Sequence, residues 1–527
     1  MMMSNPGVRR PRVPALVAGG LLLLGCGAAA AQVVQGRLEL QWGDPAPAPA
    51  EHRPPTRLLA TLVTDAGERI ALDPARARRA AGDLYALSNR RVAVAFEEAA
   101  RGILRQPVVE VIVSAERPWQ RAPMFDAAGR MLSAEAAVSG NTRWITLMCK
   151  FSDVPAEQKT LDDFNFQYSM MPGQLGHYWD EVSYGKINLD GSSAHGWFVL
   201  PLPRSGYVAT VDGEEEADLG KLFEDCAAVA DPTVDFRGAQ GVNMMINGDL
   251  DGYAWGGGAC ATLDGVHRCP RVTWNPPWAF TNVAPLAHEM GHGYGLPHSD
   301  NSDGDDDTYD NPWDLMSDAW SNAVYDDIYG GVRPKFISMQ QRDRLGWIDA
   351  TNRLVIPAGF VGSTQVELVF SGYEGMTQPQ MIVLETWPRR DPYATVVYTL
   401  EAREKLGFYE RELPGDAVII HRLEDYGTAY SVDADVPPAD VSNNEGSMFK
   451  PGERWTSPDD SFRITVDART AVGFLVTIRA KPRITGGRLP GLRKTANKMH
   501  GPAPPAQRLP GSRAYGPART DGKRPVR

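Results

Sequence analysis

The 527-residue sequence is poor in cysteine, in net positive charge and in long apolar runs. Its formal net charge of −11 argues against a general nucleic-acid-binding protein, because such proteins need a positive surface for the phosphate backbone. Beyond residue 31, no stretch reaches the roughly 18 apolar residues of a membrane-spanning helix. The sequence therefore predicts no nucleic-acid partner and no transmembrane span.

The N-terminus is typical of an export signal. Three arginines between residues 9 and 12 precede the apolar stretch Val13–Ala31, so residues 1–31 are predicted to be a signal peptide. Two processing routes stay open. The small residues Ala29–Ala31 suit ordinary cleavage, whereas residues 23–26 (Leu-Leu-Gly-Cys) resemble a bacterial lipobox, which would place a lipid anchor on Cys26. Either route predicts a secreted or cell-envelope protein.

Four cysteines follow Cys26, and four allow three pairings. Cys260 and Cys269 flank a glycine-containing turn and would close a small hairpin, which leaves Cys149 with Cys226. Because an exported protein meets an oxidising compartment, disulfides are favoured over four buried thiols.

Composition divides the chain into segments and predicts an α+β fold. Residues 32–140 form an N-terminal accessory unit or pro-region, with a short strand at Arg37–Trp42 that a Pro/Ala linker at Pro45–Pro55 separates from the rest of the unit. Residues 141–349 mix helical and strand patterns, with a strand predicted at Trp144–Phe151 and helices at Leu219–Ala230 and at about Asn282–Tyr294. Residues 350–480 contain strand-like runs separated by turn residues, which is typical of an antiparallel sandwich. Residues 481–527 carry twelve Lys or Arg and one acidic residue, and we expect this basic tail to be disordered. It is either a solvated extension or a segment that binds an anionic surface.

The chemistry is concentrated in residues 287–298, which contain His288, Glu289, His292, Gly295 and His298. On a helix, the first two histidines lie one turn apart on the same face, so both can reach one zinc ion. Gly295 can end the helix in a left-handed conformation and bring the third histidine round. Three nitrogen ligands leave one position open, as catalytic zinc sites do. Glu289 lies next to the metal and is the expected general base.

The full pattern H-E-x-x-H-x-x-G-x-x-H resembles the extended zinc motif of the metzincins. The resemblance implies a methionine turn beneath the ligands, and Met316, eighteen residues after His298, is the candidate; otherwise Met316 is a plain core methionine. Asp318 stands where some metzincins carry a tyrosine near the zinc. A tyrosine that stabilises the oxyanion is therefore unassigned, with Tyr325 and Tyr329 as substitutes.

Other passages are similar to the gametolysin and immune inhibitor A group of secreted peptidases. They are Tyr178–Lys186, Tyr309–Met316, Leu345–Ile348, and Leu413–Gly415 with Val418–His421. The likeness covers about residues 141–480. It implies a metzincin-like zinc peptidase domain at 141–349, followed by a β-sandwich-like domain at 350–480.

Two features near the motif suggest further sites. Seven aspartates lie between residues 300 and 314, and Asp300, Asp303, Asp305 and Asp307 are candidate calcium ligands, because calcium takes oxygen-rich loops. A flexible acidic loop is the alternative. The strand expected at Asp251–Gly257 has the position of the metzincin strand that lines the cleft, where an extended substrate would add as a further strand. Trp278 would frame that cleft or pack in the core.

We therefore expect an exported zinc metalloendopeptidase that acts on protein or peptide substrates. The competing hypothesis is a non-catalytic adhesin or binding protein that keeps the fold. A third is a zinc hydrolase of a non-peptide amide, which would share the ligands.

Overall fold

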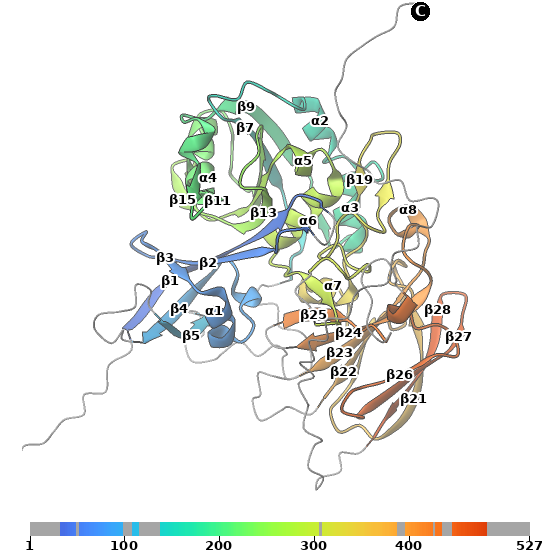
Figure 1. The fold of residues 1–527 in the computed structure, drawn as a ribbon. Helices are drawn as coiled ribbons and strands as arrows, with labels where there is room; N and C mark the ends of the chain where they lie inside the picture. Colours follow the sequence, from blue (N-terminus) through green and yellow to red (C-terminus); the bar gives the residue numbers. More distant parts are fainter. Residues whose placement is uncertain are drawn as a thin grey trace, which may run out of the picture. The chain divides into compact units, whose positions relative to one another are not determined.

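The computed structural model describes residues 32–48, 52–97, 108–114, 137–304, 308–386, 396–424, 427–434 and 445–481. The signal peptide, the Cys26 anchor and the tail beyond Lys481 lie outside these residues, so those predictions stay predictions. Strands dominate and helices are few, in agreement with the predicted α+β class (Figure 1). Within the described ranges, no helix has the length and apolar character needed to cross a bilayer.

A mixed ten-stranded sheet carries the N-terminal half of the chain. Its main path runs in the order β3 (Arg69–Leu72), β2 (Arg57–Thr64), β1 (Gln32–Pro45), β13 (Tyr253–Gly258), β16 (Arg271–Asn275), β12 (Gly241–Ile246), β7 (Trp144–Lys150) and β9 (Ser193–Val199). Strand β4 (Arg90–Glu97) also pairs with β1, and β5 (Val108–Ser114) pairs with β4. Strands β16, β12, β7 and β9 are parallel, whereas β13 runs antiparallel to β16.

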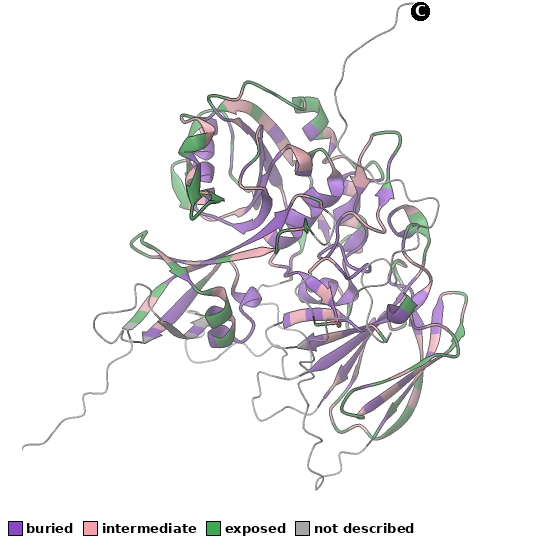
Figure 2. Ribbon diagram, viewed as in Figure 1, coloured by how far each residue is buried: buried purple, intermediate pink, exposed green. Residues whose placement is uncertain are grey.

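Helices cover both faces of this sheet. Alternate residues of β7 point to opposite faces. Ile145 and Leu147 pack on the side of α4 (Leu219–Ala230), and Trp144 and Met148 pack on the side of α3 (Leu175–Val182) and α6 (Val283–Gly293). Strands β7, β12 and β13 and helix α6 are buried along almost their whole length and form the centre of this part of the molecule (Figure 2).

Helix α4 has the bounds that the sequence predicts. Asp218 caps it by accepting a hydrogen bond from the Lys221 amide at 3.0 Å. Buried residues recur every three or four positions, and one of them is Cys226. Cys226 forms a disulfide with Cys149, and the second disulfide joins Cys260 to Cys269, so both predicted pairings are confirmed.

The N-terminal strand is longer and better connected than predicted. We expected a short strand at Arg37–Trp42, separated from the N-terminal unit by a Pro/Ala linker. Instead β1 spans 14 residues and pairs with β2 and β4, and then with β13. Leu38, Leu40 and Trp42 are buried on alternate positions, so the strand continues into the body of the molecule.

The C-terminal part consists of two facing sheets. One has the order β17 (Ser299–Asn301), β25 (Thr428–Ser431), β24 (Ala417–Glu424), β23 (Val397–Arg403), β22 (Met381–Glu385) and β20 (Arg353–Ile356). The other has the order β21 (Gly362–Val369), β28 (Gly473–Ala480), β27 (Phe462–Arg469) and β26 (Arg454–Thr456). They share one apolar core, as in a sandwich. Strand β17 directly follows His298, so this sheet crosses the boundary predicted at residue 349.

The junction between the two parts contains buried ion pairs. Arg403 in β23 is fully buried, pairs with Glu410 in α8 (Gly407–Glu410), and donates to the Trp313 carbonyl at 2.6 Å. Trp313 in turn donates its indole N–H to the Ser447 hydroxyl at 2.9 Å. The loop that leads to Met316 is therefore held by residues of the C-terminal sheets.

The remaining elements complete the described chain. They are α1 (Pro74–Ala81), α2 (Leu161–Phe166), α5 (Pro277–Phe280), α7 (Met339–Arg344), β6 (Gly140–Asn141), β8 (Ile187–Asn188), β10 (Val208–Val211), β11 (Glu214–Ala217), β14 (Ala261–Leu263), β15 (Val266–Arg268), β18 (Val324–Tyr325), β19 (Val332–Arg333), and the 3-10 turns Tyr85–Leu87, Arg204–Gly206 and Glu445–Ser447.

Candidate metal centre

Helix α6 supplies two of the predicted histidines. It is buried along almost its whole length, and His288 and His292 lie one turn apart on it. The helix ends at Tyr294, and Gly295 takes a φ of 89°, a conformation that costs glycine little. The turn brings His298 back to the same point. The role predicted for Gly295 therefore agrees with its backbone conformation.

The three imidazoles converge. The Nε2 atom of His292 lies 3.1 Å from the Nε2 of His288 and 3.1 Å from the Nε2 of His298. All three side chains are nine-tenths buried or more. The sequence thus identified a spatial cluster from residues that span only eleven positions.

The donor chemistry of the cluster fits a metal ion. The Nδ1 atoms of His288 and His292 lie 2.6 Å and 2.7 Å from the carbonyl oxygens of Leu315 and Leu296, so each Nδ1 must carry the proton. The Nε2 lone pairs then face one another and repel unless a cation lies between them. Zinc bonds of 2.0–2.1 Å in a tetrahedron separate nitrogen ligands by about 3.3 Å, close to the observed spacing. The cluster could bind a metal ion.

Met316 lies directly against α6. A Cβ placed on Gly291, between the two helical histidines, would come within 2.4 Å of the Met316 sulfur, so the glycine makes room for this side chain. The Met316 amide donates to Asp314 at 2.9 Å, and its carbonyl accepts from the Ser299 amide at 3.1 Å. The predicted methionine therefore packs beneath the histidines and between residues that hold its loop.

Glu289 is buried beside the histidines but is not a member of the cluster. Its Oε2 atom makes no hydrogen bond with any described residue. Burial, and then the charge of Asp44, raise the pKa of Glu289 well above its ordinary value. A Cβ on Gly256 of β13 would come within 2.9 Å of this Oε2 and 2.4 Å of the Glu289 carbonyl, so only glycine fits there. The predicted cleft strand thus lies against the helix at Glu289.

Asp44 is a fourth member of the cluster, and the sequence analysis missed it. Its Oδ1 lies 2.7 Å from the Nε2 of His298 and 3.4 Å from that of His288, and its Oδ2 lies 3.3 Å from the Nε2 of His292. Burial by itself would raise the pKa of Asp44, but the histidines hold it well below its usual range.

Strand pairing explains how Asp44 arrives there. Residues 41–45 of β1 pair antiparallel with residues 253–257 of β13 (Figure 1). Trp42 stacks on His292 with ring centroids 5.0 Å apart and planes 5° from parallel. Gly43 faces the Trp255 ring, where a Cβ would come within 2.7 Å. No local pattern around residue 44 indicates a ligand, because its partners lie more than 240 positions away.

The space beside Glu289 is lined by both the N-terminal segment and the body. Pro45, Pro47 and Arg53 face Trp278 and Trp320 there, and the free cavity is only about 30 Å³. Trp278 therefore lines the candidate cleft, which is one of the two positions predicted for it; the other was the core.

The tyrosine near the histidines is not one that the sequence suggested. Tyr325 and Tyr329 are each 48% exposed, and Tyr329 packs on Phe166. Tyr309 donates from its hydroxyl to the Oδ1 of Asp44 at 2.5 Å, and its ring centroid lies 5.9 Å from that of His298. Asp318 accepts hydrogen bonds from the amides of Trp320 and Ser321 instead.

The aspartate-rich loop is only partly described. Asp305 and Asp307 lie outside the described residues, and Asp300 belongs to β17. The Asp303 amide donates to Asn301, and the Asn301 amide donates to Asp310, each at 2.6 Å. These hydrogen bonds fix the described part of the loop. Whether the loop binds calcium is not tested by them, so calcium binding stays a prediction.

A comparison of the chain with protein-family models found no match, and a comparison with curated proteins found no similar sequence. The site therefore has to be interpreted from its own geometry.

Proposed function

We propose that this protein is an exported, zinc-dependent endopeptidase of the metzincin type. One observation carries the proposal: three histidine Nε2 atoms converge beside a buried glutamate that is not in the ligand cluster. A purely structural metal site has no need of a free carboxylate at that place. The parallel strands with an antiparallel strand beside α6, and the two disulfides, support the metzincin and export parts of the proposal.

His288, His292 and His298 would hold the zinc, whose charge polarises a carbonyl and lowers the pKa of water. Glu289 takes the proton of the attacking water and passes it to the leaving amine. Strand β13 pairs with the extended peptide main chain. Tyr309, whose hydroxyl reaches the same point as Asp44, donates a hydrogen bond to the oxygen of the tetrahedral species.

We infer further that the described chain is a latent form, in which residues 32–140 act as a pro-region. Residues 41–45 occupy the edge of β13 that a substrate strand would need. The carboxylate of Asp44 fills the space that the three histidines face. Removal of β1 would free both places at once.

The test uses Asp44→Asn as the parent protein, so that latency does not hide catalysis. Adding Glu289→Gln should lower cleavage of a denatured protein or a peptide library by about 10²–10⁴-fold, because a general base contributes that much. Metal analysis should still find about one zinc per chain. Glu367→Gln, a change in strand β21 of the C-terminal sheets, is the control and should cleave like the parent.

A chelator should abolish cleavage by the parent, and zinc should restore it. Full activity of the Glu289→Gln protein would refute the assigned base. Bound zinc without cleavage in every protein would instead favour the non-catalytic binding protein, and cleavage only of non-peptide amides would favour the third hypothesis.

A further inference from the structure

A second cavity, of about 310 Å³, opens near the C-terminal end of α6. One wall belongs to the N-terminal unit and contains Arg37 of β1 and Arg90 and Arg91 of β4. The other wall belongs to the body and contains Arg271 of β16 and Arg344 of α7. Ligand sites are often concave spaces of about 300–1,000 Å³, so this one is large enough for a small molecule.

The lining is unusually basic. The described residues that line the cavity include five arginines and no aspartate or glutamate. Arg344 pairs with Asp83 at 3.1 Å and Arg91 pairs with Asp65, and both carboxylates lie outside the lining. Like charges brought together from separate elements repel, and the repulsion grows where water is excluded. A bound anion would remove this cost.

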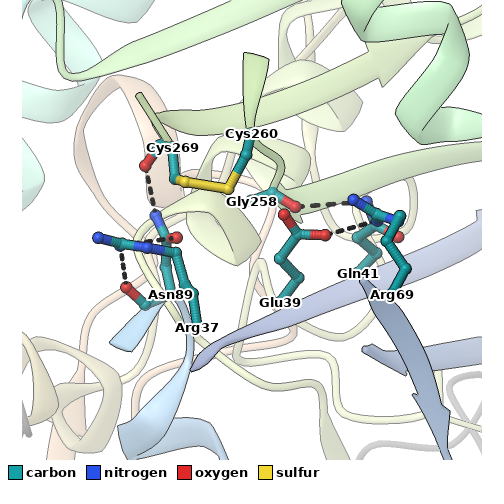
Figure 3. The surroundings of a disulfide bond; sticks show 8 residues. All are labelled: Arg37, Glu39, Gln41, Arg69, Asn89, Gly258, Cys260 and Cys269. Atoms are coloured by element: carbon teal, nitrogen blue, oxygen red, sulfur yellow. Dashed lines mark hydrogen bonds and ion pairs between the residues drawn. A yellow bond between two sulfur atoms is a disulfide. The ribbon is translucent and has the colours of Figure 1, made fainter. Parts of the chain in front are cut away.

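Two of the arginines have hydrogen-bond arrangements that suit a ligand. Arg344 is 3% exposed, and its buried Nε makes no hydrogen bond with any described residue. Arg37 donates to the carbonyl at 2.5 Å and the side-chain oxygen at 3.2 Å of Asn89, both of which are neutral acceptors. Asn89 is anchored to the Cys269 carbonyl at 3.0 Å, so the disulfide hairpin fixes this wall (Figure 3).

We propose that this cavity binds a small polyanion, either a phosphate compound or a polycarboxylate. The shared chemistry is a set of negatively charged oxygens, which the planar fork of an arginine binds in pairs. Because the arginines come from both walls, the anion would tie the N-terminal unit to the body and stabilise their association.

The location gives the site a regulatory consequence that rests on the proposed function. Arg37 and Asp44 belong to the same strand, seven residues apart, which corresponds to about 23 Å of extended chain. An anion that holds Arg37 therefore also holds β1 across the histidines. Release of the anion would favour the departure of β1 and the opening of the cleft.

The binding experiment uses the full chain with Glu289→Gln, so that self-cleavage cannot interfere. Pyrophosphate and citrate are titrated separately by calorimetry at constant ionic strength, which distinguishes the two sources of the anion. Binding of either at one site is the expected result. Arg37→Gln and Arg271→Gln should each raise Kd about tenfold or more, because each removes a charge-assisted hydrogen bond. Arg479→Gln, an exposed change in β28, should leave Kd unchanged.

Hydrogen exchange supplies the second readout. The anion that binds should slow amide exchange in β1 in the parent and in Arg479→Gln, and should have no such effect in Arg37→Gln. Lack of binding by both anions, or equal binding by all four proteins, would overturn the proposal. Binding without slower exchange in β1 would overturn its link to the strand. None of these outcomes depends on peptidase activity, so the site can fail while the proposed function stands.

Discussion

The N-terminal unit and the C-terminal sheets are attached to the same central body in opposite ways. The N-terminal unit pairs with it through strand β1 and adds side-chain contacts such as that of Asp83 with Arg344, and an arginine-lined cavity lies between the unit and the body. The C-terminal sheets are joined to it through a buried network around Arg403 and through β17, which begins directly after the third histidine. The first attachment contains a cavity lined by five arginines, and the second is a packed junction with buried ion pairs.

This contrast suits a region that leaves the body, the N-terminal unit, and a region that stays attached to it, the C-terminal sheets. Under the proposed function, the residues that contact the histidines must leave before a substrate enters, and β1 would leave together with the unit whose core it shares. The loop of Met316 must stay in place, and buried ion pairs hold it because breaking them exposes charge to an apolar interior. The N-terminal unit has its own core around Leu40 and Leu62, so its departure would leave the body intact.

The largest expected effect is a difference in stability between two variants, each of which removes one arginine, one in each region. Arg403→Met should lower the free energy of unfolding by about 3–5 kcal/mol, because Glu410 and Glu401 would be left buried without their partner. Arg91→Met, which breaks the pair with Asp65, should cost about 1 kcal/mol or less, since the two side chains are 50% and 63% exposed and the pair is screened by solvent. Urea unfolding of both variants measures the difference. Equal losses of unfolding free energy in the two variants would contradict the difference inferred between the two attachments.

A smaller effect is expected from pH at the C-terminal junction. Burial lowers the pKa of His421 to about 4, so the folded protein keeps this residue neutral while the unfolded chain binds a proton below about pH 6.5. Its contribution to stability is therefore present above pH 6.5 and is lost as the pH falls toward 4. At pH 5 the loss is about 2 kcal/mol.

His421→Gln should remove that part of the acid sensitivity. Thermal unfolding of the wild type and the variant at pH 8 and pH 5 gives the difference between them. Burial raises the pKa of the neighbouring Glu401 to about 7, and this residue acts in the opposite direction, with stability lost as the pH rises from about 4.5 to 7. The difference in stability between the two proteins is therefore the quantity to measure at each pH. An equal difference at pH 8 and pH 5 would show that His421 does not cause the acid sensitivity.

The smallest effect concerns the N-terminal attachment. Asp44→Asn removes the charge that faces the three histidines but keeps the shape of the side chain. Peptide cleavage by the full chain should rise about tenfold, which corresponds to about 1.4 kcal/mol of weaker docking. Asp65→Asn, which changes an exposed carboxylate of the same unit, is the matched control. If Asp44→Asn and the wild type both bind zinc and cleave peptide at the same measurable rate, Asp44 does not maintain latency.

Local patterns predicted most of the central elements. The strand over residues 144–150, the helix over 219–230 and the helix of the zinc motif appear within two residues of their predicted bounds. Their apolar periodicity, caps and glycines act within a few positions, and sequence reveals such signals. The predicted length of β1 was wrong, because the strand is extended by pairing with Trp255 and Gly256, which lie far along the chain. The same distance kept Asp44 from being predicted. Tyr309 lies close to His298 in the sequence, but no local pattern showed that its hydroxyl faces the histidines.

Local sequence patterns were enough to predict the cluster of three histidines, the neighbouring Glu289, the glycine that turns the chain and both disulfides. The histidines, Glu289, the glycine and the Cys260–Cys269 pair follow from spacing along a helix, a turn or a short loop, and Cys149–Cys226 is the pair that remains. The tertiary structure was needed to show that Asp44 faces the histidines, that residues near Arg403 hold the Met316 loop and that five arginines line one cavity. These arrangements depend on strands that pair across hundreds of residues, and such pairings are chosen by packing in the folded core.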